Sequence, residues 1–453
     1  MSLQVARGYE EVEALRPAWE ALQNDYVTSD VDFFLTYCRH TPNVVRPHAV
    51  LLEEDGAPAG LVVSRLEDVR MPAKLAHKVV MNSRFRALTV VYGGLLGGGD
   101  RALAGRLLAA LQASLADEAV DLVRVRMLPV GSPQHAAATA EAPFLRRQRF
   151  VTSMPHWRSE LTGSLDDFLA RRSRRRRETV RRYFRKLERT YGDDARVDVV
   201  RDGQGLDRLF ADSKLIHRET YQHILGVGFS DETVQRRLAE LCAERGWFRG
   251  YMLYLRDTPV AFWHGNAYRG VFGIGATGFH PAFAEDRPGT YLLMRAVEDL
   301  CADDSVQTLD FGFGDADYKR NFGDTFIEEE DVVVFAGKPR GVAVNALQTA
   351  FGALTAAGRA VATRTGSLGS LRRKRRAGEP TGLLRSFLPG VLVLLAVYAG
   401  AGLAVGPANA RGPERTMSSE MIVDGARRVD APTVRRRTEV RPQRRAGGAG
   451  PRR

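Results

Sequence analysis

The residues best suited to chemistry stand together at positions 310–319, after a short apolar run that predicts a strand over 308–311. Two glycines in the segment predict a sharp turn, and ligands bind where the strands of open α/β sheets end in such turns. Asp315 could accept the proton of an attacking amine or hydroxyl, and Tyr318 could return one to the leaving group. Lys319 could neutralise a phosphate. A solvated turn closed by a local ion pair is the alternative interpretation.

A second group, Arg287-Pro288-Gly289-Thr290, stands at the start of a predicted helix over 290–301. The first turn of a helix offers free N–H groups and the positive end of its dipole, and glycine lets a ligand approach the backbone closely. Arg287, Gly289 and Thr290 are therefore candidates for binding a phosphate. A plain loop, in which Pro and Gly only mark the helix start, would give the same pattern.

His217 and Tyr221 are four residues apart on a predicted helix and would share one face. Histidine needs only a modest pKa shift to act as a base near neutral pH. A structural histidine is the alternative. The three cysteines, at 38, 242 and 301, lie far apart without metal-ligand spacing, so we expect no zinc site, no disulfide framework and a reducing compartment.

Two similar series of elements could position these groups. The first has predicted strands over 48–52, 58–64 and 88–96, a helix over 101–115 and a strand over 122–127. The second has strands over 250–255, 260–266 and 271–277, a helix over 290–301 and a strand over 308–311. The repeated order of three strands, a helix and a strand predicts an internal duplication.

A charged helix is predicted between the series, over 164–191, with 11 Lys and Arg within 171–189. So many cations within five turns repel each other unless an anion or acidic neighbour compensates them. The segment is either the solvated face of a bridging helix or an anion site for a phosphate-bearing donor or acceptor.

Residues 205–337 resemble the BioF-like acetyltransferase (GNAT) domain of bacterial proteins associated with cellulose and exopolysaccharide synthesis. They are similar, more distantly, to the Fem-type aminoacyl transferases that build peptidoglycan bridges. Four stretches carry the resemblance: Leu215–Arg218 with Thr220-Tyr221, Leu255–Ala261, Pro281–Phe283 with Pro288–Leu293, and Leu309–Lys319. The first half, with Trp19 and the turn Asp55-Gly56, also resembles such proteins, so the resemblance covers 8–337. It implies an α/β fold of two tandem GNAT-like units with mixed sheets and flanking helices, followed by a C-terminal tail.

The resemblance implies an acyltransferase that moves an acyl group from acyl-CoA, such as acetyl-CoA, to an amine or hydroxyl of a cell-envelope or exopolysaccharide-related acceptor. Tyr318 would then protonate the leaving thiolate. The catalytic candidates are Asp315, Tyr318, His217 and Tyr221. The donor-binding candidates are Arg287, Gly289, Thr290 and Lys319. Two alternatives stay open: aminoacyl transfer from charged tRNA, and a non-catalytic scaffold in polysaccharide assembly.

The net charge of +12 is unevenly distributed. Residues 340–453 carry 21 Lys and Arg against 6 Asp and Glu, and the rest of the chain sums to −3. An acidic body argues against a DNA-binding function, whereas the basic tail suits an anionic membrane surface or RNA. Residues 387–406 form a 20-residue apolar run, long enough to span a bilayer, with more Arg and Lys before it than after it. We therefore expect the enzyme in the cytoplasm, anchored to the inner face of the membrane. Ala408-Asn409-Ala410 also resembles a signal-peptide cleavage site.

These patterns divide the chain into six segments. They are an N-terminal GNAT-like half (1–150), a basic bridging segment with a long helix (151–200), a C-terminal acyltransferase half (201–338), a basic linker (339–385), a candidate transmembrane segment (386–410) and a disordered basic tail (411–453).

Overall fold

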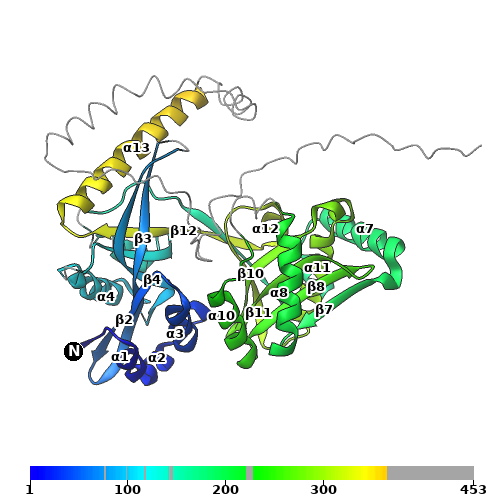
Figure 1. Ribbon diagram of the computed structural model, residues 1–453, viewed down its shortest axis with the longest axis horizontal. Helices are drawn as coiled ribbons and strands as arrows, with labels where there is room; N and C mark the ends of the chain where they lie inside the picture. The colour runs from blue at the N-terminus through cyan, green and yellow to red at the C-terminus, as the bar shows by residue number, and fades with distance from the viewer. Residues whose placement is uncertain are drawn as a thin grey trace, which may run out of the picture.

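The computed structural model describes residues 1–364, apart from 76–77, 98, 117–118, 141, 143–145 and 221–227. The candidate transmembrane segment and the basic tail lie outside the described residues. The described residues form one sheet of 12 strands in the order β1-β2-β3-β4-β5-β12-β6-β11-β10-β9-β8-β7. Figure 1 shows two lobes, an N-terminal one in blue and cyan and a C-terminal one in green.

The strands are β1 (Ser2–Ala6), β2 (Val44–Glu54), β3 (Ala57–Leu75), β4 (Lys78–Leu96), β5 (Leu122–Pro129), β6 (Met154–Glu160), β7 (Ala195–Val200), β8 (Phe248–Leu255), β9 (Thr258–Tyr268), β10 (Gly270–Phe279), β11 (Val306–Phe313) and β12 (Thr325–Phe335). The helices are α1 (Tyr9–Ala14), α2 (Arg16–Leu22), α3 (Val31–His40), α4 (Arg101–Ala113), α5 (Pro133–Ala140), α6 (Leu165–Ala170), α7 (Arg174–Tyr191), α8 (Leu206–Arg218), α10 (Thr233–Glu244), α11 (Pro288–Cys301), α12 (Asp317–Phe322) and α13 (Pro339–Arg364).

The two halves repeat one topology, as the duplicated sequence pattern predicts. In the first unit β1 to β4 are antiparallel, and β4 then runs parallel to β5. In the second unit β7 to β10 are antiparallel, and β10 then runs parallel to β11. Each parallel pair is joined by a helix, α4 or α11, because parallel neighbours need a crossover connection. The α/β fold of two tandem GNAT-like units is confirmed.

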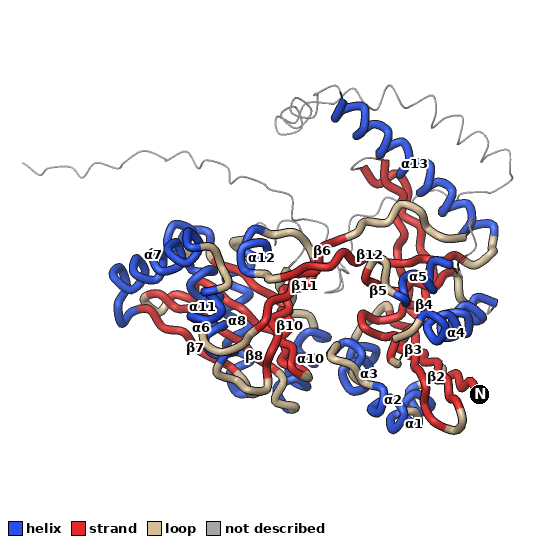
Figure 2. Tube along the Cα trace, turned by 180° about the vertical axis from the view of Figure 1, so that it is seen from behind, coloured by secondary structure: helices blue, strands red, loops and turns tan. Residues whose placement is uncertain are grey.

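The units exchange their last strands. β6, which follows the first unit in the chain, pairs antiparallel with β11 of the second. β12, which ends the second unit, pairs antiparallel with β5 of the first. β6 and β12 also pair with each other, so the two sheets become one at this joint. Figure 2 shows β6, β11 and β12 running between the lobes.

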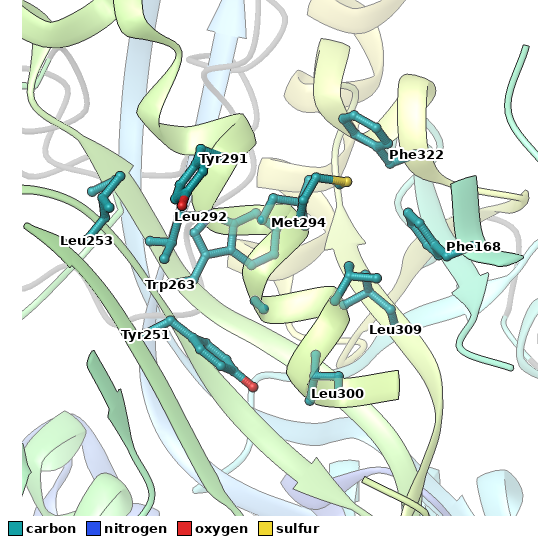
Figure 3. Packing of buried hydrophobic residues seen from close by; sticks show 14 of the residues in the cluster. Phe168, Tyr251, Leu253, Trp263, Tyr291, Leu292, Met294, Leu300, Leu309 and Phe322 are labelled. Atoms are coloured by element: carbon teal, nitrogen blue, oxygen red, sulfur yellow. The ribbon is translucent and has the colours of Figure 1, made fainter. Parts of the chain in front are cut away.

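The core of the second unit lies between the sheet and α11. Every residue of β8 is buried, and β9 sends alternate side chains to opposite faces. Trp263 meets Leu292 and Met294 of α11 on one face (Figure 3), whereas Phe262 joins α8 and α10 on the other. Each large apolar side chain buried in this way contributes about 2–3 kcal/mol. The two faces of the strands β8 and β9 are thus covered by different helices.

The structure differs from the predicted helices in two places. Val12, Leu15, Trp19 and Leu22 recur at three- and four-residue steps and predict a helix over 10–40. The structure divides this segment into α1, α2 and α3, with a proline in the first turn of α2. The helix predicted over 164–191 breaks into α6 and α7, because α6 ends at Ala170 and Ser173 caps a new helix start. Part of the segment interpreted as a basic linker is α13, whose Leu347 and Phe351 pack against Ala73 of β3.

Candidate active site

The strands β10 and β11 separate halfway along their length. Their pairing ends at Gly273 and Asp310. Beyond this point β10 follows β9 to its end at Phe279, and β11 follows β6 to its end at Phe313. A β-bulge between Ile274 and Ala276 bends β10 there. The result is a V-shaped opening between two parallel strands, which we call the β10–β11 fork.

Glycines leave this fork free of side chains. A Cβ added at Gly273 or at Gly312 would meet no atom within 4 Å. Gly312 has a positive φ of 68°, which glycine adopts without strain. No side chain at either glycine narrows the fork, so the β10 backbone can meet an extended ligand as an unpaired sheet edge does. On β11 the Gly312 amide already donates to Asp310, and the Gly312 carbonyl accepts from Lys319.

The start of α11 lies at the end of β10 and has no side-chain cap. The N–H groups of Thr290 and Tyr291 bond to the carbonyl of Arg287, and Pro288 has no N–H. In the part of the chain that the structure describes, the Gly289 amide meets no acceptor. A Cβ at Gly289 would touch only the Phe279 ring, at 3.4 Å. The helix start thus offers the unused amide of Gly289 beside Arg287 and Thr290, the other two residues predicted there to bind the donor.

The basic helix α7 lies beside this helix start. The Arg287 guanidinium lies 5.8 Å from the centre of the Tyr183 ring. Lys186 donates to the carbonyl of Glu285 at 2.9 Å and forms an ion pair with Asp286 at 2.9 Å. Because Val180 and Leu187 of α7 belong to the same core as α11, both helices lie on one face of the sheet.

The short helix α12 stands at the end of β11, across the fork from α11. Asp315 is half exposed and pairs with Arg320. Tyr318 lies on the α11 face, its ring 5.9 Å from that of Trp263 and 6.0 Å from that of Phe311. Lys319 is buried and donates to the carbonyls of Gly312 (3.2 Å) and Phe313. Burial lowers the pKa of Lys319 to about 8, although the Asp310 and Asp315 carboxylates oppose this.

His217 lies on the opposite face of the sheet, at the end of α8. It is buried, and its ring centre is 6.0 Å from that of Phe229. Phe229 also contacts His264 of β9 at 5.8 Å. Burial lowers the pKa of His264 to about 4, so this histidine is neutral at pH 7. Tyr221 lies outside the described residues.

A buried polar cluster lies at the joint of the two units, and no sequence pattern predicted it. His156 of β6 binds Asp310 through Nε2 at 2.5 Å and Glu329 of β12 through Nδ1 at 3.1 Å. The hydroxyl of Tyr92 on β4 lies 2.8 Å from the same Nδ1 and donates to Glu329 at 3.4 Å. Arg158 Nε donates to Asp310 at 3.1 Å. We call these five residues the joint cluster.

The charges in the joint cluster compensate each other. Desolvation by burial opposes protonation of His156, but hydrogen bonds to two carboxylates outweigh it and raise its pKa to about 9. Burial would raise the pKa of Asp310, but His156 and Arg158 hold it below its usual value. The imidazolium and one guanidinium thus balance two carboxylates. Asp310 is an ionised, fixed group at the apex of the fork, where it also accepts from the Gly312 amide at 2.7 Å.

The structure places the predicted site residues in three groups around one fork. Arg287, Gly289 and Thr290 lie at the end of β10, and Asp315, Tyr318 and Lys319 at the end of β11. His217 lies on the far face, beside the α8 core. An extended molecule threaded through the fork would therefore meet the first two groups on one side and His217 on the other. The catalytic and binding roles of these residues remain predictions.

The described residues contain no group of three or more His, Cys, Asp and Glu side chains placed to hold a metal ion. Among their helices, none combines the length and apolarity needed to cross a membrane.

Residues 174–320 match the family model of the Acetyltransferase (GNAT) domain. No curated protein shows significant sequence similarity to the chain. Among solved structures, FemX is 12% identical with a TM-score of 0.53, covering 75% of this chain and 98% of its own.

Two further solved structures show weaker likeness. A conserved protein of unknown function from Bacteroides thetaiotaomicron is 12% identical with a TM-score of 0.46, covering 73% of this chain and all of its own. A tandem GNAT protein from the clavulanic acid biosynthesis pathway is 13% identical with a TM-score of 0.41, covering 74% of this chain and 99% of its own. The family match spans α7 to α12 and includes the whole β10–β11 fork. Residues 174–320 thus match a GNAT-type acetyltransferase domain, and the first unit repeats the strand topology of the second.

Proposed function

We propose that the protein transfers an acyl group from acyl-CoA to an amine or hydroxyl of a cell-envelope glycan or its precursor, on the cytoplasmic side of the membrane. The observation that carries this proposal is the β10–β11 fork with its two bare glycines. An extended donor arm needs a slot where its amides can meet strand backbone, and Gly273 and Gly312 leave that slot unfilled.

The two faces of the fork suit the two substrates. On the α11 face, Arg287 and the unused Gly289 amide favour the diphosphate of the donor. On the other face, His217 and the aromatic side chains around it form the wall that an acceptor would approach. Catalysis would consist of positioning plus proton transfer, with Asp315 taking the acceptor proton and Tyr318 protonating the thiolate. No covalent enzyme intermediate is required.

Isothermal titration of the full chain with acetyl-CoA tests the proposal. We expect one donor bound per chain. Replacing Gly273 by Val should abolish this binding while leaving the melting temperature nearly unchanged, because the added side chain enters open space. The matched control is Gly203→Val, also in open space but on the surface before α8. If the unmodified chain binds no CoA ester at millimolar concentration, the proposal is wrong, and charged tRNA becomes the donor to test.

A further inference from the structure

The face of α7 that borders the fork carries a hollow built from cations. It has a volume of about 470 Å³ and is lined, among the described residues, by Ser173, Arg175, Arg176, Thr179, Arg182 and Tyr183. Three guanidinium groups, two hydroxyls and an aromatic ring thus surround a space of the size that small-molecule sites have. We refer to these six residues as the α7 hollow.

The position of the α7 hollow is fixed at both ends. At its N-terminal end Arg176 bonds to Asn321 of α12, and at its C-terminal end Tyr183 packs against Arg287 before α11. α12 follows the separated strand β11, and α11 follows β10 after a short 3-10 helix (Pro281–Asp286). The hollow therefore lies across the mouth of the β10–β11 fork. Figures 1 and 2 both show α7, α11 and α12 on the same side of the lobe.

Acidic neighbours do not neutralise all the arginines of the α7 hollow. α7 has nine Lys and Arg but two glutamates, of which Glu178 pairs with Arg174 and Glu188 with Arg295. Within the described parts of the chain, Arg175 and Arg182 have no carboxylate within ion-pair distance, and both are exposed. Cations held close together in this way favour a ligand with concentrated negative charge.

A membrane surface fits this face poorly. The apolar residues of α7, Val180 and Leu187, are buried in the core with α11, so the exposed face has no apolar stripe to enter a lipid interface. A phosphate monoester fits better, because it carries close to two negative charges and its oxygens match the guanidinium fork. Tyr183 offers a ring on which a nucleobase can stack.

We infer that the α7 hollow binds the phosphorylated ribose of the donor nucleotide, so that Arg175 and Arg182 hold the 3′-phosphate of CoA. The inference rests on the proposed function, since it assumes that the donor leaves the fork on the α11 face. α7 then acts as a specificity element: it selects a donor by the phosphate farthest from the thioester.

Calorimetric titrations of the full chain with CoA and with 3′-dephospho-CoA test the inference, since the two ligands differ only in the 3′-phosphate. We expect CoA to bind about tenfold more tightly or better, as two charge-assisted contacts allow. The double variant Arg175→Ala, Arg182→Ala should bind both ligands equally, at the affinity that the unmodified chain has for 3′-dephospho-CoA. Arg185→Ala is the matched control. This arginine is also exposed on α7 but lies outside the hollow, so the preference should persist.

The outcomes separate the two proposals. If neither ligand binds the unmodified chain, the acyl-CoA proposal itself is wrong. If both bind equally, or if the double variant retains the preference, only the assignment of the α7 hollow is wrong. A double variant that binds CoA normally but loses affinity for a short RNA oligonucleotide would also overturn the assignment.

Discussion

The two units place the same elements around the same parallel strand pair, yet only one pair leaves room for a ligand. The β4–β5 pairing ends at Val90 and Val125, where the second unit has Gly273 and Asp310. Past this point the first unit places Tyr26 against Gly93, so closely that a Cβ there would lie 2.4 Å from the ring. Both forks carry glycines, but in the first the Tyr26 ring occupies the space beside Gly93, whereas in the second a Cβ at Gly273 or Gly312 would meet nothing within 4 Å.

The starts of the crossover helices α4 and α11 also differ, in that the second is better suited to bind a phosphate. Asp100 caps α4 and accepts from the Leu103 amide at 2.8 Å, which places a negative charge where a phosphate would bind. The corresponding start of α11 follows Arg287 and has no cap. Under the proposed function, the second unit would keep the donor site, whereas in the first unit Tyr26 fills the fork and Asp100 reverses the charge at the helix start. Three changes would break or sharpen this comparison.

The largest effect should come from the joint cluster, which both units share. His156→Gln leaves the buried Glu329 without its cation and Asp310 with Arg158 alone, so we expect a loss of about 3–5 kcal/mol in the free energy of unfolding near pH 6. The pKa of His156 is raised from 6.5 to about 9, so its stabilisation is complete below pH 6.5 and is lost as the pH rises through 9.

Chemical denaturation at pH 6 and pH 9.5 measures this effect. The difference in the free energy of unfolding between the variant and the unmodified chain should be smaller at the higher pH. An equal difference at both pH values would show that the charge on His156 does not cause the stabilisation. His135→Gln is a suitable control, because this histidine pairs with Glu330 of β12 nearer the surface of the first unit. The two units should unfold together in either variant.

A smaller effect is expected from the turn after β11, which has no acid or tyrosine counterpart after β5. Asp315→Asn and Tyr318→Phe should each lower turnover of acetyl-CoA by about 100-fold, the lower end of the usual contribution of a general acid or base, with little change in stability. Steady-state kinetics measures this. Ser132→Ala, in the turn after β5, should leave turnover unchanged. Full activity in both site variants would return the turn to a structural role.

The smallest effect should follow removal of the acidic cap in the first unit. Asp100→Ala should cost about 1 kcal/mol of stability, as the loss of an N-cap does. It should create no second donor site, because Tyr26 still fills the fork. Titration with acetyl-CoA gives the stoichiometry directly. A rise from one to two bound donors per chain would mean that the charge of Asp100, and not the Tyr26 ring in the fork, prevents the first unit from binding a donor.

The hairpins of both units could be predicted from sequence because their signals are local. Asp55-Gly56 takes positive φ at both residues, as expected of such a turn, and Arg256-Asp257 adopts the same conformation without glycine. The apolar runs on either side of each turn were enough to identify the strands. The predicted strands over 250–255, 260–266 and 271–277 accordingly lie within β8, β9 and β10.

The exchanged strands could not be predicted, because their stability comes from the other unit. β12 contains four consecutive acidic residues, a pattern that disfavours a strand. In the structure Asp331 pairs with Arg124, Glu330 with His135 and Glu329 with His156. The residue spacing within β12 does not indicate which residues of other strands these acids pair with. The joint cluster was missed for the same reason: its members come from four strands far apart in the chain.

The exchange of β6 and β12 also governs how the protein can be made. The first unit leaves the ribosome without its sixth strand, so its β5 edge stays unpaired until residue 335 has been synthesised. Its folding thus depends on pairings across some 200 residues of chain, and such long-range pairings form slowly. A cut between residues 150 and 151 would therefore yield two fragments with open edges rather than two enzymes. Although the two units repeat one topology, we expect them to fold as one cooperative unit.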